Sequence, residues 1–418
     1  MKSYIDLIHY NRNFRFLWLG QIVSFLGDWF TLIASATLVS SLTHSGTAVG
    51  SLFVIRMLAP FLVSPIAGVV ADQYNRKQLL IVTDVARAVV VLCFLLIHGI
   101  DLLWLLYVLT AIKLGISGFF FPIRDAILPN LVDKTSLGTA TALSSVTWSV
   151  MFAFGTAIGG IIAGHFVVYA AFLIDAFSYI ISAILISRIQ YDYPPVIDKS
   201  SKRASAVFGQ YIDGLSYLRK NVDMFVLVLH KATVTLTSSG GFQVIQVSMA
   251  QDVFVIGRNG GISMGIMFAI VGIGTGLGPI FARRFTKDHE PFLCGAIAVS
   301  YLMISLGIAI AATMHSFEIV LVGILLRGAG GGTVWVFSTY LLMNQLPDKI
   351  RGRIFATEFA LFTLMTAVSA AITGWAIDYP ALGLSKTMWL MAGLAVIPAL
   401  FWTLFTKRFQ SGCCAHER

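Results

Sequence analysis

Long apolar runs, separated by short segments rich in charged or turn residues, occupy most of the chain. A helix needs about 20 apolar residues to cross the ~30 Å hydrocarbon core of a membrane, so each such run is a candidate transmembrane helix. Twelve runs meet this requirement: 14–40, 47–71, 78–99, 102–122, 136–164, 167–189, 222–248, 259–282, 291–313, 317–343, 353–377 and 386–406. The sequence therefore predicts an all-α polytopic membrane protein.

The composition agrees with a membrane environment. Hydrophobic residues make up 57% of the chain and charged residues 12%, whereas a soluble globular domain carries about 25% charged residues. The net charge of +9 does not indicate nucleic-acid binding, because the Lys and Arg residues sit in short clusters between apolar runs and form no continuous basic face.

The sequence lacks the motifs of enzymes and of cofactor or metal sites. It has no Gly-x-x-x-x-Gly-Lys-Ser/Thr loop and no His-Glu-x-x-His, and its 8 histidines are scattered. The four cysteines show neither disulfide-framework nor zinc spacing: Cys93, Cys294, Cys413 and Cys414. We therefore expect no enzymatic activity, no cofactor and no metal site.

Positive charge is distributed asymmetrically about the predicted helices. Lys and Arg in short loops are retained on the cytoplasmic side of a membrane. With the N-terminus inside, only Arg258 and Lys386 of the 29 basic residues fall in outside loops. Five more lie within spans: Arg56, Arg87, Lys113, Lys231 and Arg327. The asymmetry favours twelve spans in this register, with both termini cytoplasmic.

The longest hydrophilic stretch divides the predicted helices into two groups of six. It contains Tyr-Pro-Pro and Lys-Ser-Ser-Lys-Arg segments, which are typical of a solvated linker. We predict a six-helix bundle over 1–190, a cytoplasmic linker over 191–221 and a second six-helix bundle over 222–418. Apolar residues at helical spacing predict a short helix on the membrane surface within the linker: Phe208, Tyr211, Ile212, Leu215 and Leu218.

The two predicted bundles repeat short patterns at matching places. Segment 68–77 follows the second span and segment 278–287 follows the eighth, and each begins with a glycine and contains a basic pair. A Leu-Pro pair followed by an acid and a lysine comes after both the fourth and the tenth span. Paired halves of this kind are typical of transporters that rock about a central site.

Four segments resemble the major facilitator superfamily, and the match covers essentially the whole chain. The first holds Gly68, Asp72, Arg76 and Lys77. The others are FPIRDAILPNLV at 121–132, AFLIDAFSY at 171–179 and QLPDKIRGR at 345–353. They are similar to the branch that holds the enterobactin exporter, macrolide efflux pumps and the lysophospholipid transporter.

The resemblance implies a major facilitator fold of two six-helix bundles in the inner (plasma) membrane. It also implies proton-coupled transport by alternating access, most often efflux. The chain departs from the family pattern at two places. Gln73-Tyr74-Asn75 replaces the usual Arg-x-Gly, and Thr156 stands where the antiporter motif of the fifth helix has Pro.

Acidic residues within spans are candidates for proton coupling, because an ionisable group in lipid is costly unless it faces a cavity or a partner. Asp28 and Arg56 lie at similar depth on the first and second spans. Either Asp28 binds and releases a proton under the influence of Arg56, or the two form a permanent ion pair that locks the helices together. Asp175 and Glu358 are further candidates, and packing or capping is the alternative role for Asp175.

Three basic residues within spans are candidates for the substrate cavity. Lys113 and Lys231 lie about nine residues from the inner ends of their helices, so each reaches either the cavity or, as the simpler expectation, the membrane interface. Arg327 is followed by a glycine-rich segment that thins the helix beside it. A contact between Arg327 and an anionic substrate is a hypothesis that this arrangement favours.

The resemblance also implies that charges at the inner helix ends form a cytoplasmic gate. The resemblance implies that Asp72 lies at the N-terminus of the eleventh helix, where free amides favour an anion, and that Arg76 pairs with Asp125. The alternative is that the basic residues act only as topology signals. The gate candidates are Gly68, Asp72, Arg76, Lys77, Asp125 and Arg353.

Together these features predict a secondary active transporter, a proton-coupled exporter of an amphipathic or drug-like small molecule or siderophore. A lysophospholipid flippase is the alternative transporter, and a non-transporting membrane sensor or enzyme is the alternative outside transport. The expected partners are the small-molecule substrate, protons and the lipid bilayer, with the chain a monomer. Substrate, direction and coupling ion are left open by the sequence.

Overall fold

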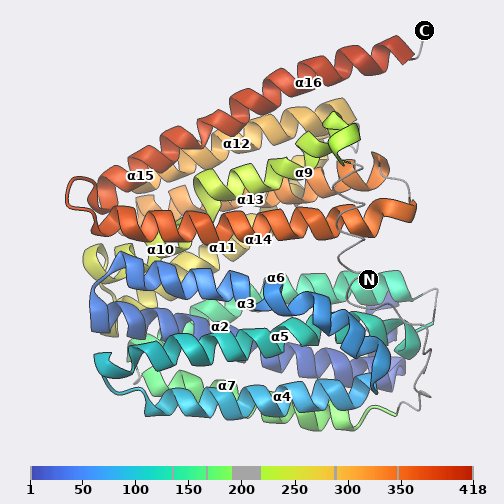
Figure 1. Ribbon diagram of the computed structural model, residues 1–418, viewed down its shortest axis with the longest axis vertical. Helices are drawn as coiled ribbons and strands as arrows, with labels where there is room; N and C mark the ends of the chain where they lie inside the picture. Colours follow the sequence, from blue (N-terminus) through green and yellow to red (C-terminus); the bar gives the residue numbers. More distant parts are fainter. Residues whose placement is uncertain are drawn as a thin grey trace. The chain divides into compact units, whose positions relative to one another are not determined.

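The computed structural model of the chain describes residues 2–133, 136–165, 168–190, 218–286, 290–345 and 348–416, and its regular structure over these ranges is entirely helical (Figure 1). The linker predicted over 191–221, with its surface helix, falls mostly outside these residues.

The first part of the chain, up to residue 190, contains nine helical segments among the described residues. They are α1 (Lys2–Tyr10), α2 (Arg12–Thr43), α3 (Gly46–Gln73), α4 (Arg76–Cys93), η1 (Phe94–Leu96), η2 (Ile100–Leu102), α5 (Leu103–Leu131), α6 (Leu137–His165) and α7 (Val168–Ser187). Two of the long helices begin at asparagine caps. The Asn11 side chain accepts a hydrogen bond from the backbone N–H of Phe14, and Asn75 does the same for Lys77 and Gln78.

The later part of the chain continues the helical pattern. Its described segments are α9 (Val222–Val234), η3 (Thr235–Ser239), α10 (Phe242–Ser248), η4 (Met249–Val253), η5 (Arg258–Gly260), α11 (Gly261–Thr286), α12 (Glu290–Ala312), α13 (Phe317–Gln345), α14 (Asp348–Asp378), α15 (Gly383–Leu394) and α16 (Val396–His416). α15 and α16 together form one apolar segment, Gly383–Thr406, that is long enough to cross a membrane.

The seventh predicted span is interrupted. Within the described residues, 11 helices are long and apolar enough to cross a membrane, and the predicted span 222–248 is instead built from α9, the π-helical turn η3 and α10. Gly240 and Gly241 follow η3, and the Gly241 N–H donates to Ser369 Oγ of α14 at 2.9 Å. A Cβ at either glycine would collide with α14. The predicted fold class is confirmed, and its seventh span contains a π-helical turn followed by two glycines that pack against α14.

The chain separates into two compact units. Unit 1 comprises Met1–His44, Ile55–Val207 and Ala250–Ala269, and unit 2 comprises Ser45–Val54, Phe208–Met249 and Ile270–Arg418. Unit 1 therefore includes a segment from the second half of the sequence, Ala250–Ala269, and unit 2 includes one from the first half, Ser45–Val54. The predicted bundles over 1–190 and 222–418 stay a prediction.

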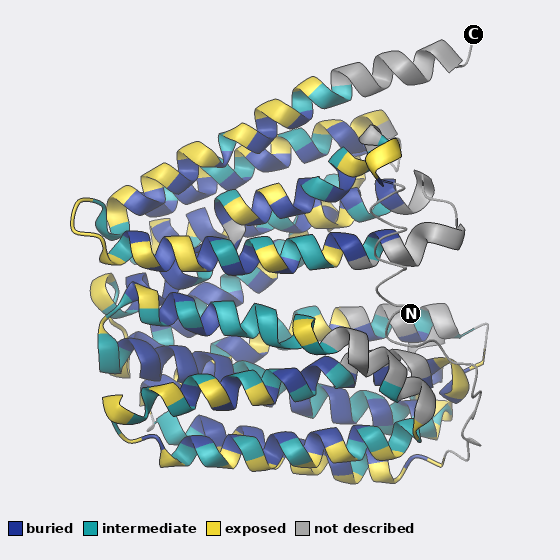
Figure 2. Cartoon of the chain, in the orientation of Figure 1, coloured by how far each residue is buried: buried dark blue, intermediate teal, exposed yellow. Residues whose placement is uncertain are grey.

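Helix α7 of unit 1 buries several polar side chains and exposes large apolar ones. Buried and exposed residues occur along the same helices (Figure 2). On α7, Asp175, Ser178 and Ser182 are buried, whereas Phe177 and Ile181 are exposed. A soluble helix would show the opposite pattern. The exposed apolar face suits a lipid solvent, and the buried polar face places ionisable groups where protein partners can satisfy them.

A glycine lets α2 and α7 approach closely beside these polar groups. A Cβ at Gly27 would lie 3.0 Å from the Cα of Asp175 and would overlap the side chains of Asp175 and Ser178. Because Asp28 follows Gly27 directly, the close approach brings the first and sixth spans together at their two aspartates.

Gly27→Ala is expected to lower the melting temperature of the purified protein, because overpacking at a tight contact costs about 1–3 kcal/mol. Gly295→Ala on α12 is the control, since nothing lies within 4 Å of a Cβ built there. It should keep or raise the melting temperature, as alanine favours a helix over glycine by about 1 kcal/mol. Equal effects of the two changes would contradict the close approach of α2 and α7.

Candidate functional site

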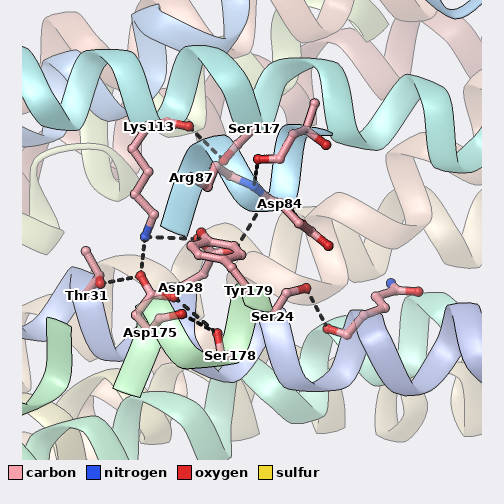
Figure 3. A network of polar contacts seen from close by, with 12 residues as sticks. Ser24, Asp28, Thr31, Asp84, Arg87, Lys113, Ser117, Asp175, Ser178 and Tyr179 are labelled. Atoms are coloured by element: carbon pink, nitrogen blue, oxygen red, sulfur yellow. Dashed lines mark hydrogen bonds and ion pairs between the residues drawn. The ribbon is translucent and has the colours of Figure 1, made fainter. Parts of the chain in front are cut away.

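Unit 1 contains a cluster of ionisable side chains drawn from four helices (Figure 3). We call it the charge cluster and define it as Asp28 of α2, Asp84 and Arg87 of α4, Lys113 of α5, and Asp175 and Tyr179 of α7. All of these side chains point toward one another between the helices (Figure 3). Their separation in the chain is large, so the fold alone assembles them.

Lys113 bridges two of the three carboxylates. Its Nζ lies 2.7 Å from Asp175 Oδ2 and 3.2 Å from Asp28 Oδ1. Lys113 is 2% exposed, so its ammonium group is held by protein carboxylates. Thr31 of α2 also donates a hydrogen bond to Asp175 Oδ2. The lysine therefore ties α5 to both α2 and α7.

Arg87 holds the other side of the cluster. It is paired with Asp84 three residues earlier on α4, and its Nη1 lies 3.9 Å from Asp28 Oδ2. The guanidinium carbon lies 4.3 Å from the ring centroid of Tyr179 and 4.6 Å from that of Phe120. Aromatic faces attract a cation, so both rings stabilise the buried charge.

Asp28 is the most exposed carboxylate of the charge cluster. Its side chain is 26% exposed, whereas Asp84 and Asp175 are fully buried. It interacts with Lys113 and Arg87, and it accepts a hydrogen bond from Tyr179 Oη at 2.5 Å. Because the Asp28 carboxylate faces two cations, a proton bound to it would weaken its attraction to both.

The predicted pair of Asp28 and Arg56 is not formed. Asp28 pairs with Lys113 and Arg87, and Arg56 makes no ion pair among the described residues, although its charge interacts with that of Asp28. Similar depth on neighbouring helices was the basis of the prediction. Depth does not fix which way each side chain points around its helix axis, and the structure directs two other cations at Asp28.

A second ion pair lies in unit 2. Lys231 of α9 approaches Glu358 Oε1 of α14 at 2.9 Å and donates to Thr339 Oγ1 of α13 at 2.8 Å. The Nζ also lies 4.4 Å from the centroid of the Trp335 ring. Three helices are thus joined at one buried ammonium group.

The expectation that Lys113 and Lys231 extend to the membrane interface is wrong. Both are buried and ion-paired inside their units. Snorkelling requires a free path along the helix surface to water. Neither lysine needs that path, because a carboxylate on an adjacent helix lies within reach.

The sequence interpretation gave no role to Asp84, Arg87 or Tyr179. Asp84 and Arg87 lie three residues apart in an apolar run, which places them on one face of a helix. An acid and a base at this spacing in a transmembrane run are a signal for an intramembrane ion pair, and this signal was available. Tyr179 carried no such signal, because a tyrosine in an apolar run usually indicates packing.

The predicted cytoplasmic gate is described only in part. Arg76 Nη1 donates to Asn130 Oδ1 at 3.1 Å, and the Lys77 backbone N–H donates to Asn75. The surroundings of Gly68 and the side chains of Asp72, Asp125 and Arg353 lie outside the described residues. The pairing of Arg76 with Asp125 and the place of Asp72 stay predictions. Within the described part of the chain, no group of three or more His, Cys, Asp or Glu side chains is placed to hold a metal ion.

Comparison with known proteins decides the family. The family model described as Major Facilitator Superfamily matches residues 17–357. The chain belongs to this superfamily. It is 24% identical over 395 residues to the uncharacterised MFS-type transporter YfiS of Bacillus subtilis (strain 168), covering 93% of this chain and 92% of the relative. It is 24% identical over 415 residues to the multidrug resistance protein MdtG of Salmonella paratyphi C (strain RKS4594), covering 96% and 97%.

The fold agrees with this assignment. The crystal structure of the nucleoside transporter NupG superposes with a TM-score of 0.71 at 14% identity, covering 94% of this chain and 99% of that chain. The predicted superfamily is therefore confirmed. This major facilitator protein is a multi-pass membrane transporter of a small molecule, and its relatives and fold are those of transporters and not of enzymes.

Glu358→Gln in this transporter is expected to destabilise unit 2 by about 3 kcal/mol, because it leaves the buried Lys231 without its counter-charge. The double variant Lys231→Met with Glu358→Gln should recover much of that loss. Melting temperatures of the purified variants measure both effects. A double variant as unstable as the sum of the two single variants would contradict a direct interaction.

Proposed function

We propose that this transporter is a proton-coupled exporter of an amphipathic or drug-like small molecule, a class that includes siderophores, and that it works by alternating access in the inner (plasma) membrane. The observation that carries the proposal is the contact of one partly exposed carboxylate, Asp28, with two buried cations. The similarity to MdtG, which is named a multidrug resistance protein, supports efflux as the direction.

Asp28 is the proposed proton carrier. In the structure it holds Lys113 and Arg87 through charge, and these cations stand on α5 and α4. A proton on Asp28 removes the attraction of its carboxylate for both cations. The ion pairs Lys113–Asp175 and Arg87–Asp84 remain. Protonation thus loosens α2 from its neighbours without leaving a buried cation unpaired, so the two protonation states favour different helix packings.

The ion pair of unit 2 has a different proposed role. Lys231 and Glu358 join α9, which precedes the π-helical turn, to α14. Both groups are almost fully buried, so proton exchange there requires the helices to separate. We assign to this pair a positioning role in unit 2, with Glu358 as a secondary site of proton coupling.

Asp28→Asn is expected to abolish cargo-dependent proton movement and to leave the protein folded, because the amide keeps the shape of the side chain. The cargo is chosen from metabolites and drugs that accumulate in a strain lacking the transporter. Everted membrane vesicles are energised, the cargo is added, and the internal pH is followed with a fluorescent amine. Asp101→Asn, at an exposed position in η2, is the matched control and should behave as the wild type.

Cargo-dependent proton movement that is unchanged in Asp28→Asn would remove the role assigned to that residue. Export that survives collapse of the proton gradient would remove proton coupling altogether. A flippase is distinguished by the same vesicles, because uptake of a labelled lysophospholipid without transport of soluble cargo would replace the exporter proposal.

A further inference from the structure

Unit 2 buries a second cation, Arg327 of α13, in a setting unlike that of the ion-paired lysines. Arg327 is 7% exposed. Its guanidinium carbon lies 4.2 Å from the centroid of the Phe242 ring on α10. Among the residues that the structure describes, no acidic side chain forms an ion pair with it, and its buried Nε has no hydrogen-bond partner.

Two neighbouring helices pack closely against the backbone of α13 beside Arg327. A Cβ at Gly307 of α12 would lie 2.6 Å from the backbone N of Arg327. On another side, a Cβ at Gly274 of α11 would lie 2.7 Å from the Leu325 carbonyl oxygen. Phe242 of α10 covers the guanidinium itself. Arg327 is thus buried inside unit 2, with one aromatic ring against its charge.

A second unpartnered donor stands on the same helix face as Phe242. Gln246 follows Phe242 by four residues on α10, so the two side chains are neighbours along one face. Gln246 is 1% exposed, and its Nε2 has no hydrogen-bond partner among the described residues. Two buried N–H donors therefore lack an acceptor in unit 2, one stacked on Phe242 and the other one turn along the same helix as Phe242.

Buried donors without acceptors are costly, and a buried cation without a counter-charge is more so. A phenylalanine ring alone offsets only part of this cost. An oxyanion meets both needs, because it supplies the charge for Arg327 and acceptor oxygens for both donors. Intramembrane cations of this kind commonly mark substrate pathways.

We infer that Arg327, Gln246 and Phe242 form a binding subsite for the anionic group of the cargo, a carboxylate or phosphate attached to an apolar body. Identifying the bound anion as part of the transported cargo rests on the proposed function. The guanidinium and the amide bind the oxygens, and Phe242 contacts the apolar carbon next to them. The proton site in unit 1 and the anion subsite in unit 2 are separate groups of residues.

The test uses purified full-length protein and matched pairs of small probes. Phenylbutyrate is compared with phenylbutyramide, and phenyl phosphate with phenol, at equal concentrations. Ligand that binds the native state raises the melting temperature. We expect at least one anionic probe to raise it by about 2 °C or more, and its neutral counterpart to leave it unchanged. The pair that responds distinguishes a carboxylate from a phosphate.

Three variants locate the effect. Arg327→Gln should lose the anion-dependent shift, and Arg327→Lys should keep part of it, because lysine retains the charge without the planar fork. Gln246→Leu should reduce the shift and should raise the melting temperature of the unliganded protein, because it removes an unsatisfied buried donor. Arg258→Gln, at an exposed cation of η5, is the control and should keep the full shift.

Absence of an anion-dependent shift in the wild type would overturn the inference, and so would a full shift in Gln246→Leu or Arg327→Gln. The readout needs no gradient, so it is independent of proton coupling. Asp28→Asn should retain the anion-dependent shift. If Asp28→Asn keeps both the anion-dependent shift in melting temperature and normal proton coupling, only the proton role of Asp28 is contradicted. If Arg327→Gln loses the shift but exports cargo normally, the subsite binds anions without being needed for transport.

Discussion

The structure of this transporter depends on how it satisfies charges that lipid cannot solvate. Lys113 shows the solution most clearly, because its single ammonium group holds carboxylates from two other helices. The hydrophobic effect does not hold helices together within a bilayer, so close packing and polar contacts between helices must do so. The ion pairs are therefore part of the packing of unit 1 as well as its candidate chemistry.

The two units treat their buried charges differently. In unit 1 each cation of the charge cluster has its own fully buried carboxylate, and Asp28 is shared between them. In unit 2 Lys231 is paired and Arg327 stacks on Phe242. This division suits a transporter in which one unit responds to a proton and the other to a solute, because each stimulus then changes the electrostatic balance of a different group.

The sequence predicted the membrane fold well, since apolar runs of spanning length leave few alternatives in lipid. It could not predict the π-helical turn in the seventh span, because apolar spacing does not encode a local change in backbone hydrogen bonding. It identified Asp28, Lys113 and Asp175 singly and missed that they touch. Spacing along a helix gives depth, whereas partner choice depends on rotation about each axis, which only packing such as that at Gly27 determines.

The central claim is that Asp28 takes up a proton inside the charge cluster. Infrared difference spectroscopy of the purified transporter between alkaline and acidic buffer tests it most directly, because a protonated carboxyl has a carbonyl band separate from that of the carboxylate. The account predicts a protonation band in the wild type that Asp28→Asn removes and Asp101→Asn keeps. A band of unchanged size in Asp28→Asn would contradict the account.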